Sequence, residues 1–199
     1  MFSYQTLSYS SEGIYKEKGS KFIGIAFPCF SIEDFKKKIV EIKTNYHDAR
    51  HFCFAYRLKP DGTLSRFNDD GEPNNSAGKP ILGQIDHFNI TNSGIVVIRY
   101  FGGTKLGVGG LIKAYREAAR EAVNNNQIIK KEITSILNVN FPYSEMNIIM
   151  KMIKDFDLEI KNQKMFLNCE MTLEFPIRFK DELSTKLDQY INIKKTFSE

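Results

Sequence analysis

The 199-residue sequence lacks long hydrophobic runs and contains few cysteines. No apolar stretch approaches the roughly 18 residues that a membrane-spanning helix needs, so we expect no membrane association. Residues 1–20 contain no signal-peptide hydrophobic segment, which predicts a cytoplasmic protein. Cys29, Cys53 and Cys169 are odd in number and lie far apart, a pattern that excludes a disulfide framework and a Cys-x-x-Cys metal site.

The usual nucleotide-binding motifs are also missing, although one stretch is rich in glycine. A P-loop needs a lysine directly after its second glycine, where this chain has Val108. The dinucleotide-binding pattern needs a third glycine, where this chain has Ile112. These differences argue against a nucleoside triphosphatase and against a Rossmann dehydrogenase.

The glycine-rich stretch lies between an expected strand and an expected helix. The run Ile95–Ile98 is apolar and β-branched, as in a fully buried strand. The helix that follows has a small-residue inner face formed by Leu111, Tyr115, Ala118 and Ala122. A glycine loop that opens a helix suits an anion, because free N–H groups and the helix dipole attract negative charge. The alternative is that these glycines only let the helix pack tightly on the sheet.

Positive charge is concentrated on this stretch. The net charge is +4, and residues 1–130 carry 18 Lys and Arg against 13 Asp and Glu, whereas the remainder carries 10 against 11. Within residues 99–120 the cations are Arg99, Lys105, Lys113, Arg116 and Arg120, opposed only by Glu117. Such clustering indicates a polyanionic partner, although a solvated helix face would give the same pattern.

Three carboxylates stand within four residues at Asp69, Asp70 and Glu72. They suggest a divalent cation site or a general acid–base pair, but they do not match an EF-hand. A structural alternative is an Asx-type turn whose carboxylates accept backbone N–H groups. We favour the turn, with one of the acids contacting Arg99 or Lys105.

Two histidines and a cysteine near residue 50 suggest either a zinc site or a cysteine nucleophile. His47, His51 and Cys53 are zinc-type ligands, but nothing supplies a fourth ligand at a usual spacing. A Cys53 nucleophile with His51 as its base lacks an identifiable orienting partner. We therefore expect no metal site, no cofactor and no catalytic residue.

Hydrophobic periodicity predicts two domains of the α+β class. In residues 1–128 we expect a strand at 20–27, a helix at 32–44 with Ser31 as its N-cap, a strand at 49–58 and a helix at 77–88. Asn124–Asn126 ends the long helix and marks the boundary. The pattern of residues 129–199 predicts the element order β-α-β-β-α-β, which is that of a ferredoxin-like domain. We expect this domain to be a binding or docking module.

Four blocks of sequence resemble the YigZ/IMPACT family: 48–57, 68–73, 76–82 and 99–111. Asn74-Asn75-Ser76 departs from the small Ser-Gly-Thr type run that is usual there, without changing the turn chemistry. The resemblance implies an N-terminal two-layer α/β domain similar to the second domain of a small-subunit ribosomal protein. It also implies a C-terminal ferredoxin-like domain similar to the last domain of elongation factor G. Eukaryotic members regulate translation by acting on the activation of a kinase through an extra N-terminal domain, and we do not expect that role here.

The residues and the resemblance together predict a non-catalytic, translation-associated regulator that binds RNA or a ribosomal surface. One alternative is an enzyme that acts on a small phosphorylated or anionic substrate through Asp69, Asp70 and Glu72. Another is a protein-interaction module with a translation-related partner. The sequence leaves the oligomeric state open. The expected anion-binding residues are Arg99, Gly102, Gly103, Thr104, Lys105, Gly107, Gly109, Gly110, Lys113, Arg116, Arg120 and Lys79.

Overall fold

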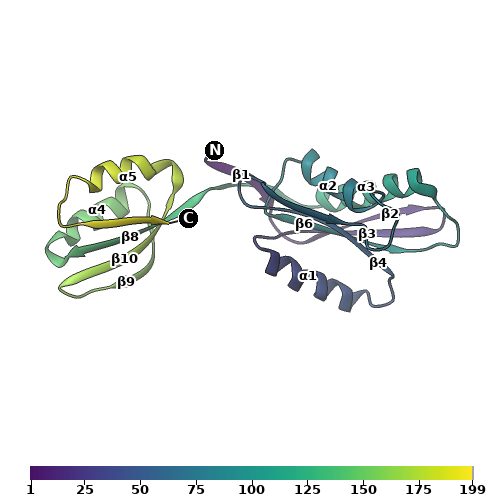
Figure 1. Cartoon of the computed structure of the whole chain (residues 1–199), viewed down its shortest axis with the longest axis horizontal. Coiled ribbons are helices and arrows are strands. Elements are labelled where there is room, and N and C mark those ends of the chain that lie inside the picture. The colour runs from purple at the N-terminus through teal and green to yellow at the C-terminus, as the bar shows by residue number, and fades with distance from the viewer. Residues whose placement is uncertain (199) are drawn as a thin grey trace. The chain divides into compact units, whose positions relative to one another are not determined.

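The computed structural model describes residues 1–198, which form two compact units (Figure 1). One unit comprises Ser3–Lys131, and the other begins at Glu132. Each unit combines helices with a sheet, which confirms the α+β class. The division follows Lys131 and not residue 128, because β7 (Ile128–Glu132) pairs with β1 (Ser3–Leu7) and so belongs largely to the first unit.

The first unit is built on an antiparallel five-stranded sheet with the order β2-β3-β6-β4-β5. Its elements besides β1 and β7 are β2 (Ser11–Glu17), β3 (Ser20–Pro28), α1 (Ile32–Asn45), β4 (His51–Leu58), β5 (Leu64–Asn68), α2 (Gly78–His87), β6 (Ser93–Tyr100) and α3 (Gly107–Asn124). The predicted N-cap of α1 is confirmed, since the Ser31 hydroxyl accepts the Asp34 backbone N–H at 3.0 Å.

Helices cover both faces of this sheet, with α1 on one face and α2 and α3 on the other (Figure 1). Along β6, Ile95 and Val97 pack with α2 and α3, whereas Val96 and Ile98 pack with α1. The first unit therefore has three layers where two were expected. Central strands that are apolar on both sides require cover on both sides, as the continuous run of β6 indicates.

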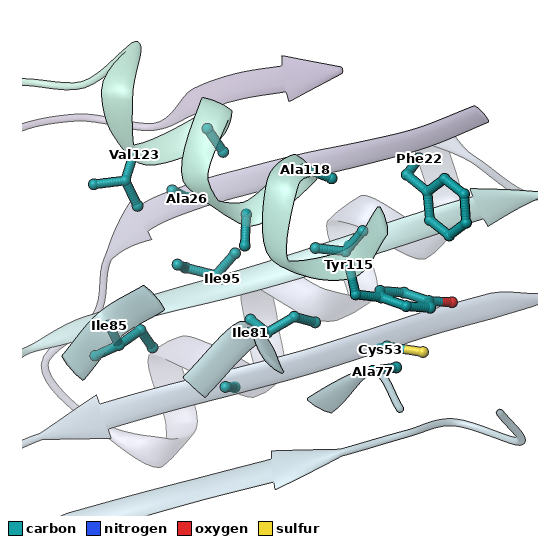
Figure 2. Packing of buried hydrophobic residues seen from close by; sticks show 14 of the residues in the cluster. Phe22, Ala26, Cys53, Ala77, Ile81, Ile85, Ile95, Tyr115, Ala118 and Val123 are labelled. Carbon is teal, nitrogen blue, oxygen red and sulfur yellow. The ribbon is translucent and has the colours of Figure 1, made fainter. Parts of the chain in front are cut away.

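The helix α3 lies unusually close to the sheet, and glycines in the strands make this possible. A Cβ on Gly24 would stand 2.3 Å from the carbonyl oxygen of Ala118, and one on Gly13 would stand 2.2 Å from the backbone nitrogen of Ala122. The predicted inner face of α3 is confirmed, with Tyr115 and Ala118 buried over the sheet (Figure 2). The glycines that bring helix and sheet together are thus in β2 and β3.

The second unit has the ferredoxin-like element order expected from the sequence. Its strands form an antiparallel sheet with the order β11-β8-β10-β9. The elements are β8 (Thr134–Pro142), the 3-10 helix η1 (Tyr143–Glu145), α4 (Met146–Asp155), β9 (Glu159–Lys164), β10 (Asn168–Pro176), the 3-10 helix η2 (Ile177–Phe179), α5 (Lys180–Leu187) and β11 (Lys194–Ser198). Within residues 1–198, no helix is both long enough and apolar enough to cross a bilayer.

Candidate functional site

Two segments far apart in sequence meet where β4 begins and β6 ends. Antiparallel pairing sets His51 of β4 opposite Arg99 of β6. The loop before β4 therefore adjoins the loop after β6, and the Tyr100 hydroxyl donates to Asp48 at 2.7 Å. Between them lies a hollow of about 620 Å³, which we call the sheet-end hollow. It is lined by Asp48, Ala49, Arg50, His51, Arg99, Tyr100, Phe101 and Lys105.

The sheet-end hollow combines exposed cations with aromatic rings. Arg50 and Lys105 are exposed, and within residues 1–198 neither has an ion-pair partner. Phe101 is 59% exposed, which is high for so large an apolar side chain. The hydrogen bond to Asp48 raises the pKa of Tyr100 to about 12 and lowers the pKa of the Asp48 carboxyl. Tyr100 thus remains a neutral phenol while Asp48 carries the negative charge.

Arg99 lines the hollow but is not a free cation. Its Nη1 donates to Glu72 Oε1 at 2.6 Å, and the two side chains are only 9% and 5% exposed. The Tyr115 hydroxyl donates to the same oxygen at 2.8 Å. The guanidinium carbon lies 5.4 Å from the centre of the Phe101 ring and 5.6 Å from that of Phe22. Arg99 therefore forms a buried part of the wall of the hollow, in contact with Phe101, and Glu72 compensates its charge.

The acidic turn is used for structure, as the Asx-turn interpretation predicts. The Asp69 carboxylate accepts the backbone N–H groups of Asn75, Ala77 and Gly78 at 2.9, 3.0 and 2.8 Å. It thereby caps the start of α2, which lacks a side-chain cap from its own N-cap residue. Asp70 accepts the backbone N–H of Phe52 at 2.7 Å.

The three carboxylates thus serve three different partners and do not converge on a common point. The predicted contact between the acidic turn and Arg99 is the one that Glu72 makes. Within the described part of the chain, no three His, Cys, Asp or Glu side chains are grouped to hold a metal ion. The geometry therefore supplies neither a cation cage nor an acid–base pair at this turn.

Cys53 and His51 lie on the same face of β4 but in different surroundings. The Cys53 thiol is buried and donates to the Asp69 carbonyl at 2.9 Å, and burial raises its pKa, so it is a poor nucleophile. The Nδ1 atom of His51 lies 2.9 Å from the Asp70 carbonyl oxygen. Because a carbonyl only accepts, Nδ1 carries the proton and a neutral His51 keeps Nε2 as an acceptor.

The glycines of the loop that precedes α3 have separate roles. A Cβ on Gly102 would stand 1.9 Å from the backbone of Gly19, so this position requires glycine for close packing. Gly103 and Gly107 have φ angles of +86° and +71°, the left-handed region that glycine favours. A Cβ on Gly109 would meet nothing within 4 Å, whereas one on Gly110 would press on Leu106. The surface around Gly103, Gly107 and Gly109 is therefore open.

The start of α3 is electrostatically uncompensated. Leu106 at the N-cap provides no side-chain hydrogen bond, and the first turn contains no acidic residue. The first N–H groups of an α-helix have no partner within the helix, and they carry the positive end of its dipole. Lys105 lies directly before this turn, and Thr104 beside it is also exposed. This end of α3 can therefore accept an anion.

The remaining predicted cations are spread over a wider surface. Arg116 is exposed and, within residues 1–198, makes no ion pair, whereas Arg120 pairs with Glu117 and Lys113 lies 4.0 Å from Glu17. Lys79 is exposed in the first turn of α2 and does not line the sheet-end hollow. Of the predicted anion-binding residues, Arg99 and Lys105 line the hollow, whereas the glycines of the loop do not. Along α3, Arg116 is the cation without an ion pair within residues 1–198.

Sequence reasoning missed the other half of the hollow, namely Asp48, Arg50, His51, Tyr100 and Phe101. The first three belong to a block that precedes the glycine loop by about 50 residues in the chain, a separation that only the pairing of β4 with β6 closes. Two signals were present in the sequence: the family resemblance of blocks 48–57 and 99–111, which contain all five residues, and Phe101, a large apolar side chain between a charged strand end and glycine.

Comparison with known proteins agrees with the resemblance seen in the sequence. Residues 18–123, more than half of the chain, match the family described as the Impact N-terminal domain. The IMPACT family member YvyE of Bacillus subtilis is 27% identical over 199 residues, covering 100% of this chain and 92% of that protein. The IMPACT family member YigZ of Escherichia coli is 29% identical over 175 residues, covering 87% and 86%. A crystal structure of a hypothetical protein superposes with a TM-score of 0.77 at 27% identity, covering 100% and 97%. The chain belongs to the IMPACT family.

Proposed function

We propose that this protein binds RNA, free or exposed on the ribosome, and modulates translation without catalysing a reaction. The observation that carries the proposal is the sheet-end hollow, whose lining includes an exposed aromatic ring and two cations, Arg50 and Lys105, that make no ion pair within residues 1–198. Lys105 lies two residues before the open start of α3. The cytoplasmic location expected from the sequence would place the protein with its ligand.

The chemistry of the hollow suits a phosphate-bearing chain. Lysine and arginine neutralise backbone phosphates, and open N–H groups at a helix start bind phosphate oxygens. Arg50 and Lys105 can supply the first contact, and the turn from Gly107 to Gly110 the second. Exposed aromatic rings among cations are typical of surfaces that bind RNA, since bases stack on them. Phe101 provides such a ring.

The enzyme alternative receives less support from the same contacts. Asp69 and Asp70 accept backbone N–H groups and Glu72 neutralises Arg99, so their oxygens are engaged in holding the turn. The protein-interaction alternative shares the cations with our proposal, because an acidic protein would also be attracted to them. An exposed aromatic ring such as Phe101 also suits a protein interface, so competition with an acidic polypeptide must distinguish the two alternatives.

The proposal is tested by titrating the purified protein with a labelled structured RNA at several salt concentrations. Arg50→Ala and Lys105→Ala should each weaken binding and reduce the slope of log affinity against log salt by about 0.7–0.9, the contribution of one phosphate contact. Lys36→Ala, which removes an exposed lysine of α1 that does not line the hollow, is the matched control and should leave both unchanged.

Absence of binding at low salt would contradict the proposal, as would equal effects of Lys36→Ala and Lys105→Ala. Poly-glutamate serves as a competing acidic polypeptide at equal charge. Competition as effective as that of unlabelled RNA would favour an acidic protein partner. Competition much weaker than that of RNA would support recognition of nucleotide groups beyond their charge.

A further inference from the structure

Phe101 is held in place as an exposed ring. It directly follows Tyr100, the last residue of β6, and β6 is paired on one side with β3 and on the other with β4, so the strand that leads into Phe101 is held on both sides. The guanidinium of the buried Arg99 lies 5.4 Å from its ring centre, and Glu72 fixes that guanidinium in turn. A ring that is oriented before binding loses little conformational freedom when a ligand stacks on it. Phe101 is therefore a preorganised stacking platform.

The hollow is too large and too varied in chemistry for a phosphate group alone. Its volume of about 620 Å³ lies in the range of sites that enclose small organic ligands. Asp48 within it would repel a bare phosphate, whereas a carboxylate has acceptor sites beyond the one that Tyr100 uses and can accept a hydrogen bond from a hydroxyl or amino group. The neutral form of His51 adds a second acceptor through Nε2. Acceptors beside cations match a ligand that has donors as well as phosphate.

We infer that the sheet-end hollow holds one unpaired nucleotide of the bound RNA. Its base stacks on Phe101, its phosphate lies against Arg50, Lys105 and the start of α3, and its sugar hydroxyl or base amino group donates to Asp48. This inference rests on the proposed function and adds that the ligand is single-stranded or looped. A base inside a duplex is stacked on its neighbours and cannot place its face on a side chain.

The test compares a labelled single-stranded RNA of about ten nucleotides with the same strand in a perfect duplex. The single strand should bind more tightly. Phe101→Ala should weaken its binding about 5- to 150-fold, the effect of losing one base–aromatic stack, with an unchanged salt slope because no charge is removed. Phe101→Tyr retains the ring and should keep most of the affinity.

Phe30→Ala is the matched control, since Phe30 is a 50% exposed aromatic residue outside the hollow, and it should not change binding. Thermal unfolding of each variant separates loss of contact from loss of fold. If RNA binding is salt-dependent but Phe101→Ala does not change the affinity, and the single strand and the duplex bind equally well, the inference is overturned and the proposed function is still supported. Failure to bind either RNA at low salt would overturn both.

Discussion

At the scale of single residues, Glu72 links the core of the first unit to the sheet-end hollow. Its carboxylate accepts hydrogen bonds from the Arg99 guanidinium at the end of β6 and from the Tyr115 hydroxyl of α3. Burial raises the pKa of Tyr115, which therefore stays protonated as a donor. A residue that the sequence offers as a general acid or metal ligand thus positions the guanidinium beneath Phe101.

Glu72→Gln should destabilise the fold strongly. The substitution leaves the Arg99 guanidinium buried without a compensating charge, which costs about 3–5 kcal/mol in comparable pairs. Urea unfolding at pH 7 measures the change in the free energy of unfolding. Glu41→Gln is the control, since Glu41 is exposed and pairs with Lys38 on α1, and it should cost no more than about 1 kcal/mol. A similar small effect for both variants would contradict the structural role of Glu72.

At the scale of elements, local patterns predicted much of the fold. The strand predicted at 49–58 corresponds to β4 (His51–Leu58), in which Cys53 and Ala55 pack on one face of the sheet and Phe52, Phe54 and Tyr56 on the other. The stripe of Leu111, Tyr115, Ala118 and Ala122 correctly gave the buried side of α3. Both predictions succeed because side-chain direction follows from the strand and helix periods alone.

The features that the sequence did not predict depend on contacts between residues that are distant in the chain. Isolated glycines such as Gly13 and Gly24 do not reveal which helix will approach them, and α3 lies about 100 residues further along the chain. The hollow requires the register that sets His51 against Arg99, which no local period encodes. The cover of the second sheet face by α1 likewise depends on how the strands are ordered, since β6 lies between β3 and β4, the two strands that α1 connects in sequence.

Gly24→Ala should separate α3 from the sheet. The added Cβ would stand 2.3 Å from the carbonyl oxygen of Ala118, so helix and strand must shift, and overpacking of this kind costs about 1–3 kcal/mol. Gly83→Ala is the matched control because a Cβ there meets nothing within 4 Å and lies in α2, where alanine should stabilise by about 0.5–1 kcal/mol. Chemical unfolding of both variants would show opposite signs. Equal signs would contradict the close-packing role of Gly24.

At the scale of the whole molecule, the excess positive charge and the residues of the candidate site belong to one unit. Residues 1–130 carry the excess of cations and contain every residue of the sheet-end hollow. The second unit has its own buried cluster around Phe141, Phe175 and Leu183, and residues 132–199 contain 9 Lys and Arg against 11 Asp and Glu. The first unit therefore holds every residue of the proposed RNA contact, and the second unit adds no net positive charge.

A fragment of residues 1–133 should consequently fold and bind RNA with nearly the affinity of the whole chain. Its salt slope should also match, because the slope counts phosphate contacts and the proposed contacts all lie in this fragment. A fragment of residues 1–127 is the informative comparison, since it lacks β7 and leaves β1 without its partner strand. Thermal unfolding should show a lower midpoint for the shorter fragment. If residues 1–133 fold but lose RNA binding, the second unit contributes contacts, and the N-terminal unit alone is not the binding surface.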